Sequence, residues 1–325
     1  MTSLLDWGIT IAQQGLYEHI VQPLLRATGQ MQLSELAFDA MEWPVIGLIE
    51  FFVIVPFLWA LERAFPVEEV TDHAAIRTDA VYTFLHRFGV FPLLAFLLLT
   101  PAFDGLESML RLAGLSRGNL DAFLPGLVDR PWVSFIGYLI VLDFADYWIH
   151  RGQHGWSRWW ALHALHHSQR QMTFWSDDRN HVLDDLIRDA LLAGVALMIG
   201  VAPSQFIWLV VASRVFQQLQ HANVRLRFPK ALSRLLVSPE FHRRHHGIGV
   251  GHEGAVKGVN FGVLFPWWDQ LFGTADWADG FIPTGIRDQL QGRNYGDGLV
   301  EQQWLGLCRM VEPSNSEESP LMEHS

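Results

Sequence analysis

Four long apolar stretches alternate with polar segments along the chain. The first two, 43–61 and 88–103, have about the length that a helix needs to cross a bilayer, although the second is somewhat short. The third, 131–149, runs into a histidine-rich segment. The fourth, 190–213, is broken near Pro203, which predicts a hairpin of two short helices that either re-enters or spans the membrane. The pattern predicts an all-α integral membrane protein with about four transmembrane helices, the hairpin included.

The basic side chains indicate how these helices are oriented. Arg26 is the only Lys or Arg among the first 42 residues, whereas the loop after the first apolar stretch carries Arg63, Arg77 and Arg87. Further arginines follow the hairpin closely. Because cytoplasmic loops are enriched in Lys and Arg, we expect the N-terminus outside and the histidine-rich segments in a helical cap on the cytoplasmic side. The expected location is a bacterial inner membrane, which the chain crosses several times.

The composition agrees with a membrane protein and narrows its chemistry. Half of the 325 residues are hydrophobic and only 18% are charged, unlike an ordinary soluble domain of this size. The net charge of −11 argues against a nucleic-acid partner, because a phosphate backbone requires clustered Lys and Arg. The single cysteine, Cys308, excludes disulfides, Fe–S clusters and Cys-x-x-Cys zinc sites within the chain. A metal ion must therefore be bound by imidazole, helped at most by carboxylate.

A helix over 132–154 would bring several chemically active side chains to one face. Asp143, Asp146, His150 and His154 recur at i, i+3, i+7 and i+11, so the two histidines can share one metal ion. Asp146 precedes His150 by one turn, and we expect its carboxylate to accept the free ring N–H and to fix the tautomer. The alternative for this aspartate is a buried ion pair or a helix–helix hydrogen bond.

The same helical spacing recurs in two further histidine clusters. One histidine pair is weak evidence for a metal site, but three clusters in one chain favour one. Two other histidines are additional candidates: His181, with Asp184 three residues later to orient its ring, and His221 after the hairpin. The predicted metal ligands are His150, His154, His163, His166, His167, His181, His221, His242, His245 and His246. The remaining five, His19, His73, His86, His252 and His324, are assigned to structural or solvent-exposed positions.

The chain divides into three predicted regions. Residues 1–42 form an N-terminal segment without a signal-peptide pattern, and 4–25 within it predicts an interfacial amphipathic helix or a peripheral packing helix. Residues 43–274 form the membrane-embedded catalytic domain. Residues 275–325 form a cytoplasmic extension whose acidic, Ser-rich end is predicted to be disordered. The glycine-rich segment 247–254 follows no strand and is interpreted as a flexible connection rather than a nucleotide-binding loop.

The three histidine clusters, spaced HxxxH, HxxHH and HxxHH, resemble the three histidine boxes of the fatty acid hydroxylase/sterol desaturase superfamily. The segment around His181 resembles the family's Arg/His segment, and His221 resembles its later isolated histidine. Asn260-Phe261-Gly262 resembles the NYG element, with Phe in place of Tyr. Residues 268–274 resemble the family's WD and FGT ending. The resemblance covers about 132–274.

The resemblance implies a non-haem diiron site on the cytoplasmic side of a four-helix membrane core. It implies oxygen-dependent C–H oxidation of a membrane lipid, fatty acyl chain or sterol-like substrate, with hydroxylation favoured over desaturation. Two iron ions would be the cofactor and molecular oxygen the co-substrate. An external ferredoxin or cytochrome b5-type donor would supply electrons, since the chain offers neither a flavin or nicotinamide fold nor a cysteine cluster. Asp146, Asp184 and Asn260 are the candidates for contacts that support the metal ligands.

Two other classes of protein remain open. A histidine-ligated membrane zinc enzyme or hydrolase would use zinc to activate water, but none of the three clusters contains the glutamate that serves as general base in HExxH sites. A non-catalytic metal-binding membrane protein would spread its ligands across the bilayer midplane, whereas these ligands lie at helix ends on one side. Iron content distinguishes the three classes.

Overall fold

The computed structural model describes residues 4–114, 118, 126, 130–253 and 257–311. Within these ranges the chain forms helices and irregular connections without a β-strand, so the all-α prediction is confirmed. The elements in chain order are α1 (Leu4–Leu16), a π-helical turn (Tyr17–Val21), α2 (Gln22–Ala27), a 3₁₀ turn (Met31–Leu33), α3 (Ser34–Ala40), α4 (Glu42–Ala64), α5 (His73–Arg87), α6 (Val90–Leu112), α8 (Pro131–Gly155), α9 (Ser157–His167), the 3₁₀ helix η3 (Phe174–Asp178), α10 (Val182–Ile199), α11 (Pro203–His221), α12 (Lys230–Ser233), α13 (Pro239–His245), α14 (Trp267–Phe272), a 3₁₀ helix (Arg287–Gln291) and α15 (Leu299–Val311).

Among the described residues, three helices are long and apolar enough to cross a membrane. The segments are Met31–Ala64, which contains α4, Leu93–Leu112 in α6, and Pro131–Gly155, which is α8. They correspond to the first three predicted stretches. Helix α6 continues beyond residue 103, where the second predicted stretch ends, and its last turns carry a Glu107–Arg111 ion pair at i,i+4 spacing.

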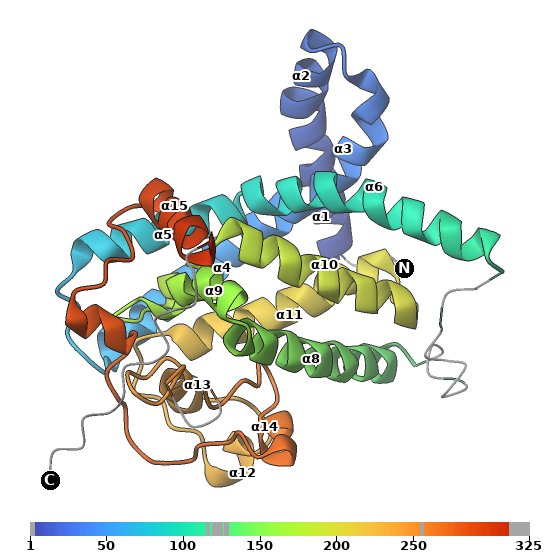
Figure 1. Ribbon diagram of the computed structural model, residues 1–325. Coiled ribbons are helices and arrows are strands. Elements are labelled where there is room, and N and C mark those ends of the chain that lie inside the picture. The colour runs from blue at the N-terminus through green and yellow to red at the C-terminus, as the bar shows by residue number, and fades with distance from the viewer. Residues whose placement is uncertain (1–3, 115–117, 119–125, 127–129, 254–256, 312–325) are drawn as a thin grey trace, which may run out of the picture.

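The predicted hairpin at 190–213 is present as α10 and α11. Gly200 ends α10 in the left-handed region, with φ of 78°, and Pro203 begins α11. Helices α8, α10 and α11 lie side by side, with α6 against α10 and α4 against α11 (Figure 1). Their shared core contains Tyr138, Leu142 and Leu209. Helices α9 and α13 lie at the end of this bundle where α8 finishes (Figure 1).

The N-terminal helices project from the bundle as a separate arm (Figure 1). Helix α1 packs against the bundle, where its Ile9 is buried with Val45 of α4 and Ile207 of α11. Leu93 of α6 packs against Tyr17 and Ala37 at the base of the arm. Trp7 and Ile11 on the same helix are exposed. The sequence predicts an interfacial amphipathic helix or a peripheral packing helix over residues 4–25. One face of α1 does pack against the bundle, while its other face leaves apolar side chains uncovered. The C-terminal residues 312–325, predicted to be disordered, lie outside the described residues.

A buried charge cluster joins α4 and α5 to the segment that follows the second histidine cluster. Arg87 at the end of α5 is 1% exposed and donates to Glu50 of α4 at 2.6 Å. Its other terminal nitrogen lies 3.7 Å and 3.5 Å from Asp177 and Asp178 of η3. A Cβ at Gly47 would lie 2.0 Å from the Arg87 carbonyl, so α4 accepts this close approach only with glycine. Because unpaired buried charges cost several kcal/mol, the cluster holds α4, α5 and η3 in one arrangement.

Candidate metal centre

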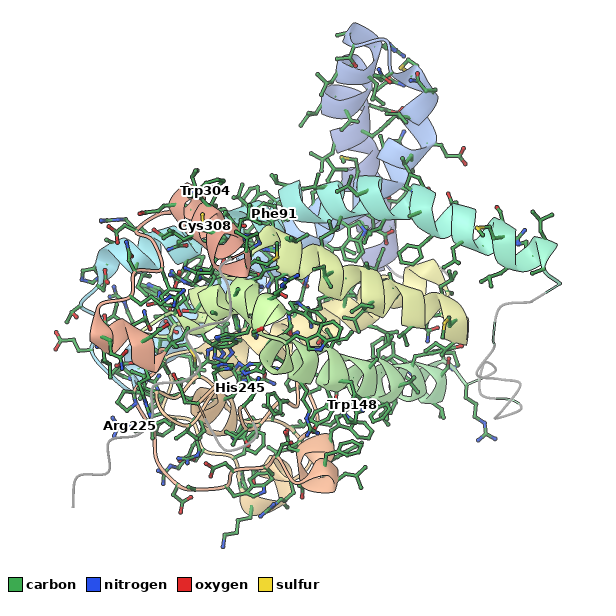
Figure 2. All side chains as sticks on the ribbon, viewed as in Figure 1. Phe91, Trp148, Arg225, His245, Trp304 and Cys308 are labelled. Carbon is green, nitrogen blue, oxygen red and sulfur yellow. The ribbon has the colours of Figure 1, made fainter. Side chains whose placement is uncertain are left out.

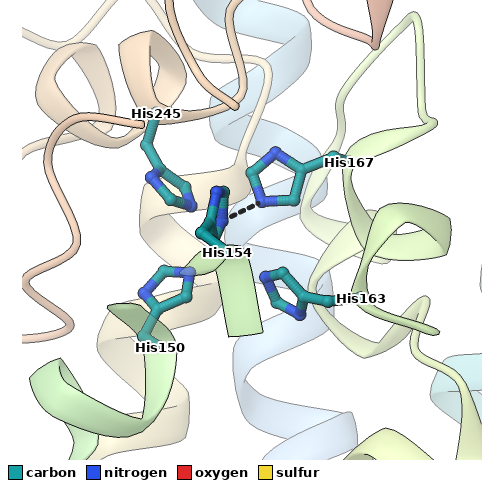
Figure 3. A group of neighbouring side chains, drawn as sticks. All are labelled: His150, His154, His163, His167 and His245. Carbon is teal, nitrogen blue, oxygen red and sulfur yellow. Dashed lines mark hydrogen bonds between the residues drawn. The ribbon is translucent and has the colours of Figure 1, made fainter. Parts of the chain in front are cut away.

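Nine histidines form two buried groups where α8, α9, α11 and α13 meet, close to the His245 label in Figure 2. Within each group, one ring nitrogen per residue lies within 4.8 Å of every other. Both groups lie in the interior, because every member is less than 9% exposed. The first group contains His150, His154, His163, His167 and His245 (Figure 3), and the second contains His166, His221, His242 and His246.

Helical spacing explains how neighbouring histidines divide between the two groups. His150 and His154 are one turn apart on the buried face of α8, and His163 and His167 are one turn apart on α9. His166 lies between the latter two in sequence but points elsewhere around α9, toward His221 at the end of α11. Helix α8 ends at Gly155 and the next residue, Trp156, is extended. This interruption between the two helices lets α9 pack back against α8.

In the first group the outer ring nitrogens bond to the scaffold. The Nδ1 atoms of His150 and His245 lie 2.9 Å and 2.7 Å from the carbonyl oxygens of Phe261 and Val259. The Nδ1 atom of His163 lies 2.9 Å from Asp184. In each case the carbonyl or carboxylate oxygen accepts, so Nδ1 carries the proton and Nε2 keeps its lone pair for the centre. The rings in Figure 3 converge accordingly, with Nε2 of His154 and His167 3.1 Å apart.

The second group is more compact. The Nε2 atom of His221 lies 3.1 Å from that of His166 and 3.0 Å from that of His242, and the Nε2 atoms of His242 and His246 are 3.1 Å apart. The Nδ1 atom of His221 lies 2.8 Å from the Gln217 carbonyl and 3.1 Å from an oxygen of Asp177. Four imidazole nitrogens thus share one small space.

This donor set fits metal ions. Nε2 of His163 and Nε2 of His245 are buried and have no hydrogen-bond partner among the described residues. Leaving buried acceptors unpaired costs about 1–3 kcal/mol each, whereas a cation between convergent lone pairs satisfies all of them. Imidazole nitrogen suits iron, zinc, copper and nickel, so the set fits a transition metal in each group without selecting one.

Burial keeps these rings neutral. It lowers the pKa of His245 to about 3, with neighbouring imidazoles acting in the same direction and the bond to the Val259 carbonyl opposing them. The pKa values of His166, His167, His242 and His246 also fall well below the ordinary value, first through burial and then through neighbouring imidazoles. The neutral imidazole is the form that binds a metal ion.

Asp269 shapes the loop that supports His150. The backbone N–H groups of Phe261 and Gly262 donate to its two oxygens at 2.8 Å and 2.7 Å, and the Thr274 hydroxyl donates at 2.6 Å. A Cβ at Gly262 would lie 2.8 Å from an Asp269 oxygen, so this turn requires glycine. The loop motifs seen in the sequence therefore belong to one hydrogen-bonded turn that aims the Phe261 carbonyl at His150.

Asp146 does not contact His150, so this expected hydrogen bond is wrong. Both oxygens of Asp146 accept from Arg188 of α10, one at 2.9 Å from Nε and the other from a terminal nitrogen. A two-bond pair with a guanidinium outcompetes a single bond to an imidazole, and His150 uses the Phe261 carbonyl instead. Asp146 therefore forms the buried ion pair that was the alternative to a contact with His150.

His181 belongs to neither group, which contradicts its prediction as a ligand. It precedes α10 as the N-cap, its Nδ1 accepts from the Leu183 N–H at 3.1 Å, and its Nε2 lies 2.9 Å from the Gln303 carbonyl of α15. Asp184 does not orient His181, since its carboxylate faces His163 on α9. His181 and its segment therefore help to fasten α15 beside the site.

Asn260 supports the site through backbone rather than through a histidine. It adopts φ of 57°, a left-handed conformation that asparagine tolerates better than most residues. Its side-chain nitrogen donates to the Phe241 carbonyl at 2.9 Å, and its oxygen accepts from the Asp276 N–H at 2.7 Å. It thereby ties the loop to α13, one residue before His242.

Sequence reasoning missed several supporting groups. Asp177 lies beside His221, and its only signal was its place in the acidic segment before His181. The carbonyl oxygens that accept from histidines carry no sequence signal, because any residue supplies one. His252, assigned no cluster, stacks on Trp160 with ring centroids 3.6 Å apart, and Trp160 in turn lies 4.9 Å from His154. Residues 247–253 thus form a turn that covers the first group.

An apolar cavity of about 230 Å³ lies beside the histidines, between α6, α8, α10 and α11. Most of its lining is apolar, including Leu139 and Phe206. A smaller cavity of about 50 Å³ is lined by histidines of both groups. Asp146, Arg188 and Gln217 line both cavities, so the apolar space ends at the polyhistidine centre.

The fold and the site together define a helical, membrane-type protein with a buried polyhistidine centre beneath an apolar cavity. Residues 135–274 match the family model described as fatty acid hydroxylase. The matched range contains all nine clustered histidines and ends with the turn that Asp269 organises. Residues 135–274 form a domain of the fatty acid hydroxylase/sterol desaturase superfamily.

Curated relatives each match less than half of the chain. An ornithine lipid hydroxylase, OlsE, of Rhizobium tropici is 32% identical over 136 residues, which are 42% of this chain and 40% of the relative. Methylsterol monooxygenase 1-3 of Arabidopsis thaliana is 25% identical over 46% of this chain and 50% of its own length. Alkylglycerol monooxygenase of Caenorhabditis elegans is 29% identical over 45% of this chain and 27% of its own length. The match thus spans half or less of each relative's length, and no solved structure matches significantly.

If each histidine group binds one metal ion, His163→Ala and His242→Ala should each lower the metal content of the purified protein toward half and leave the other group occupied. Metal analysis of the folded fraction measures this. His181→Ala is the matched control, because His181 is buried near the site but outside both groups. Unchanged metal content in both variants, or an equal loss in the control, would contradict the assignment.

Asp184 should matter more for metal binding than Asp146. Asp184→Asn keeps the volume but removes the negative charge that orients His163, so metal affinity in a chelator competition should fall by about 10- to 100-fold. Asp146→Asn is the matched control, since Asp146 pairs with Arg188 and forms no hydrogen bond or ion pair with a histidine in the described structure. Equal losses in the two variants would show that general disturbance, rather than histidine orientation, lowers affinity.

Proposed function

We propose that this protein is a membrane oxidoreductase that hydroxylates a C–H bond of a lipid with molecular oxygen. The observation that carries the proposal is the meeting of an apolar cavity with two histidine groups at Asp146, Arg188 and Gln217. Relatives named as lipid hydroxylase and sterol monooxygenase support it. One relative is named as a sterol desaturase, so hydroxylation rather than desaturation is part of the proposal.

The proposed cofactor is a pair of iron ions, one in each group. When bound, such ions supply oxygen activation, which no side chain of this protein provides. The histidines hold neutral ligand atoms in place through their outer hydrogen bonds, with Asp184 and Asp177 fixing the rings of His163 and His221. The apolar cavity excludes water from the C–H bond and orients it toward the centre. His181 is not part of this ligand set.

The overall reaction requires reactants and electrons that the chain itself does not supply. A C–H bond, molecular oxygen, two electrons and two protons give an alcohol and water. An external one-electron donor of the ferredoxin or cytochrome b5 type is the proposed partner. The proposed substrate is a membrane lipid, fatty acyl chain or sterol-like molecule, since the cavity lining is mostly apolar and its neighbouring helices are membrane-type.

The proposed placement is in a bacterial inner membrane with the histidines toward the cytoplasm. About four helices would span it: α4, α6, α8 and, as one hairpin, α10 with α11. Residues 1–42 would be the N-terminal arm, 43–274 the catalytic domain and 275–325 a cytoplasmic extension. The extension does not stand apart from the domain, because α15 packs on α9 and its Gln303 bonds to Asn180 at 2.9 Å.

Cys308 tests this orientation, because it is the single cysteine, partly exposed on α15 (Figure 2). A membrane-impermeant maleimide should label Cys308 in inverted vesicles and leave it unlabelled in intact cells. A permeant maleimide should label Cys308 in both inverted vesicles and intact cells, and Cys308→Ser should abolish the labelling. Labelling of intact cells by the impermeant reagent would overturn the proposed orientation.

The activity test is oxygen incorporation into lipid by the purified, iron-loaded protein with a reducing system. Isotope-labelled molecular oxygen should appear as one oxygen atom in a lipid product, measured by mass spectrometry. Ala193→Phe, which fills the apolar cavity, should lower turnover by at least 10-fold while metal content stays unchanged. Ala60→Phe on the exposed face of α4 is the matched control and should retain activity.

Three outcomes would count against the proposed reaction. A product that has lost two hydrogens and gained no oxygen would indicate desaturation. Full activity with zinc and none with iron would favour the hydrolase class. Equal turnover of the Ala193→Phe variant and the wild type would show that the apolar cavity does not hold the substrate.

A further inference from the structure

Helix α11 connects the apolar cavity to the second histidine group along one face. Arg214, Gln217 and His221 recur at i, i+3 and i+7, so they lie above one another on this helix. Arg214 and Gln217 line the apolar cavity, and Gln217 and His221 line the smaller cavity. Seven residues of helix rise by about 10 Å, which is the separation of Arg214 from His221 along the axis.

Three other ionic groups that line the cavity, Asp143, Asp146 and Arg188, are paired within the protein. Asp146 is paired with Arg188. Asp143 accepts from the backbone N–H groups of Leu264 and Phe265 and from the Trp268 indole, at 2.8 Å, 3.2 Å and 2.8 Å. These side chains are therefore part of the scaffold.

Arg214 differs from them. Its guanidinium makes no hydrogen bond or ion pair with any residue that the structure describes, and its contact is with the Trp43 ring, 5.7 Å from the centroid. Asp189 lines the same cavity and interacts electrostatically with Arg214, but none of its oxygens lies within ion-pair distance in the described chain. His86 and Asp185 share with both residues a small neighbouring cavity of about 30 Å³. The donors of Arg214 therefore border the cavity without a hydrogen-bonded acceptor among the described residues.

Arg214 is half-buried and presents the N–H donors of its guanidinium to the cavity. Its planar fork matches the two oxygens of a carboxylate or phosphate. We infer that Arg214 binds an anionic oxygen group of the lipid that enters this cavity. The inference rests on the proposed function for the role of that lipid as substrate, and it narrows the substrate class to lipids with a carboxylate or phosphate group.

The position of Arg214 also sets which carbon is oxidised. An anionic group held there lies about two helical turns from His221, so the lipid carbons that reach the histidines are those at a fixed distance from that group. Arg214 is thus a specificity-determining residue rather than a metal ligand. Gln217, between the two, borders the path that these carbons follow.

Equilibrium binding of radiolabelled lipids to the purified protein in detergent tests this role without requiring turnover. The probes are palmitate, hexadecyl phosphate and hexadecanol, which share one chain and differ in the polar group. Wild-type protein should bind one of the two anions more tightly than hexadecanol, and the preferred anion identifies the group. Arg214→Gln should weaken binding of that anion by about 10- to 100-fold and leave hexadecanol unchanged. Arg214→Lys should restore part of the preference.

Arg234→Gln is the matched control, because Arg234 also lies over a tryptophan, Trp277 at 3.7 Å, but outside the cavity. It should bind all three probes as the wild type does. The inference is overturned if wild type shows no preference for either anion, or if Arg214→Gln keeps the preference. It is also overturned if Arg214→Gln weakens all three probes equally and lowers the melting temperature, because Arg214 would then be structural. Absence of oxygen incorporation with intact anion selectivity would count against the proposed reaction alone.

Discussion

The arrangement depends on the burial of nine imidazoles whose ring nitrogens face one another. A buried acceptor without a donor costs free energy, and packed protonated rings would repel one another. Burial lowers the pKa of His245 to about 3, so the neutral form is retained in the interior. Convergent neutral rings leave lone pairs that only donors or cations can satisfy. The two groups of five and four histidines therefore present two sets of ligand atoms that could hold metal ions, and α9 contributes histidines to both.

The surrounding residues of the site orient those rings through hydrogen bonds. In the first group the supporting contacts lie on other segments than their histidines: Asp184 of α10 faces His163 of α9, and the Phe261 carbonyl faces His150 of α8. The loop that supplies the carbonyl is shaped by Asp269, which binds two consecutive N–H groups. Ring orientation thus depends on several packed elements at once. This dependence explains why the matched family segment extends past the last histidine cluster to residue 274.

Buried ionic contacts connect the apolar bundle to the centre. Arg179 donates to Asp79 of α5 at 2.7 Å and to the Leu165 carbonyl of α9 at 3.2 Å, so it links α5 to a helix that carries histidines of both groups. Arg188 on α10 ties to Asp146 on α8 at the point where the two cavities meet. Charges placed this deep stabilise one arrangement of helices more than they stabilise the folded state, because any other arrangement leaves them unpaired.

Periodicity alone determined the helical class, three of the membrane-type helices, the hairpin break near Gly200 and the eight histidines of the three clusters. These are local properties: helical spacing decides which side chains share a face, and apolar length decides which helices suit a membrane. The division of adjacent His166 and His167 between two groups, the pairing of Asp146 with Arg188 and the exclusion of His181 were decided by tertiary structure. The reason is that a carboxylate or a ring nitrogen bonds to the best partner in space. For Asp146 that partner is a guanidinium on another helix, and no sequence spacing reveals it.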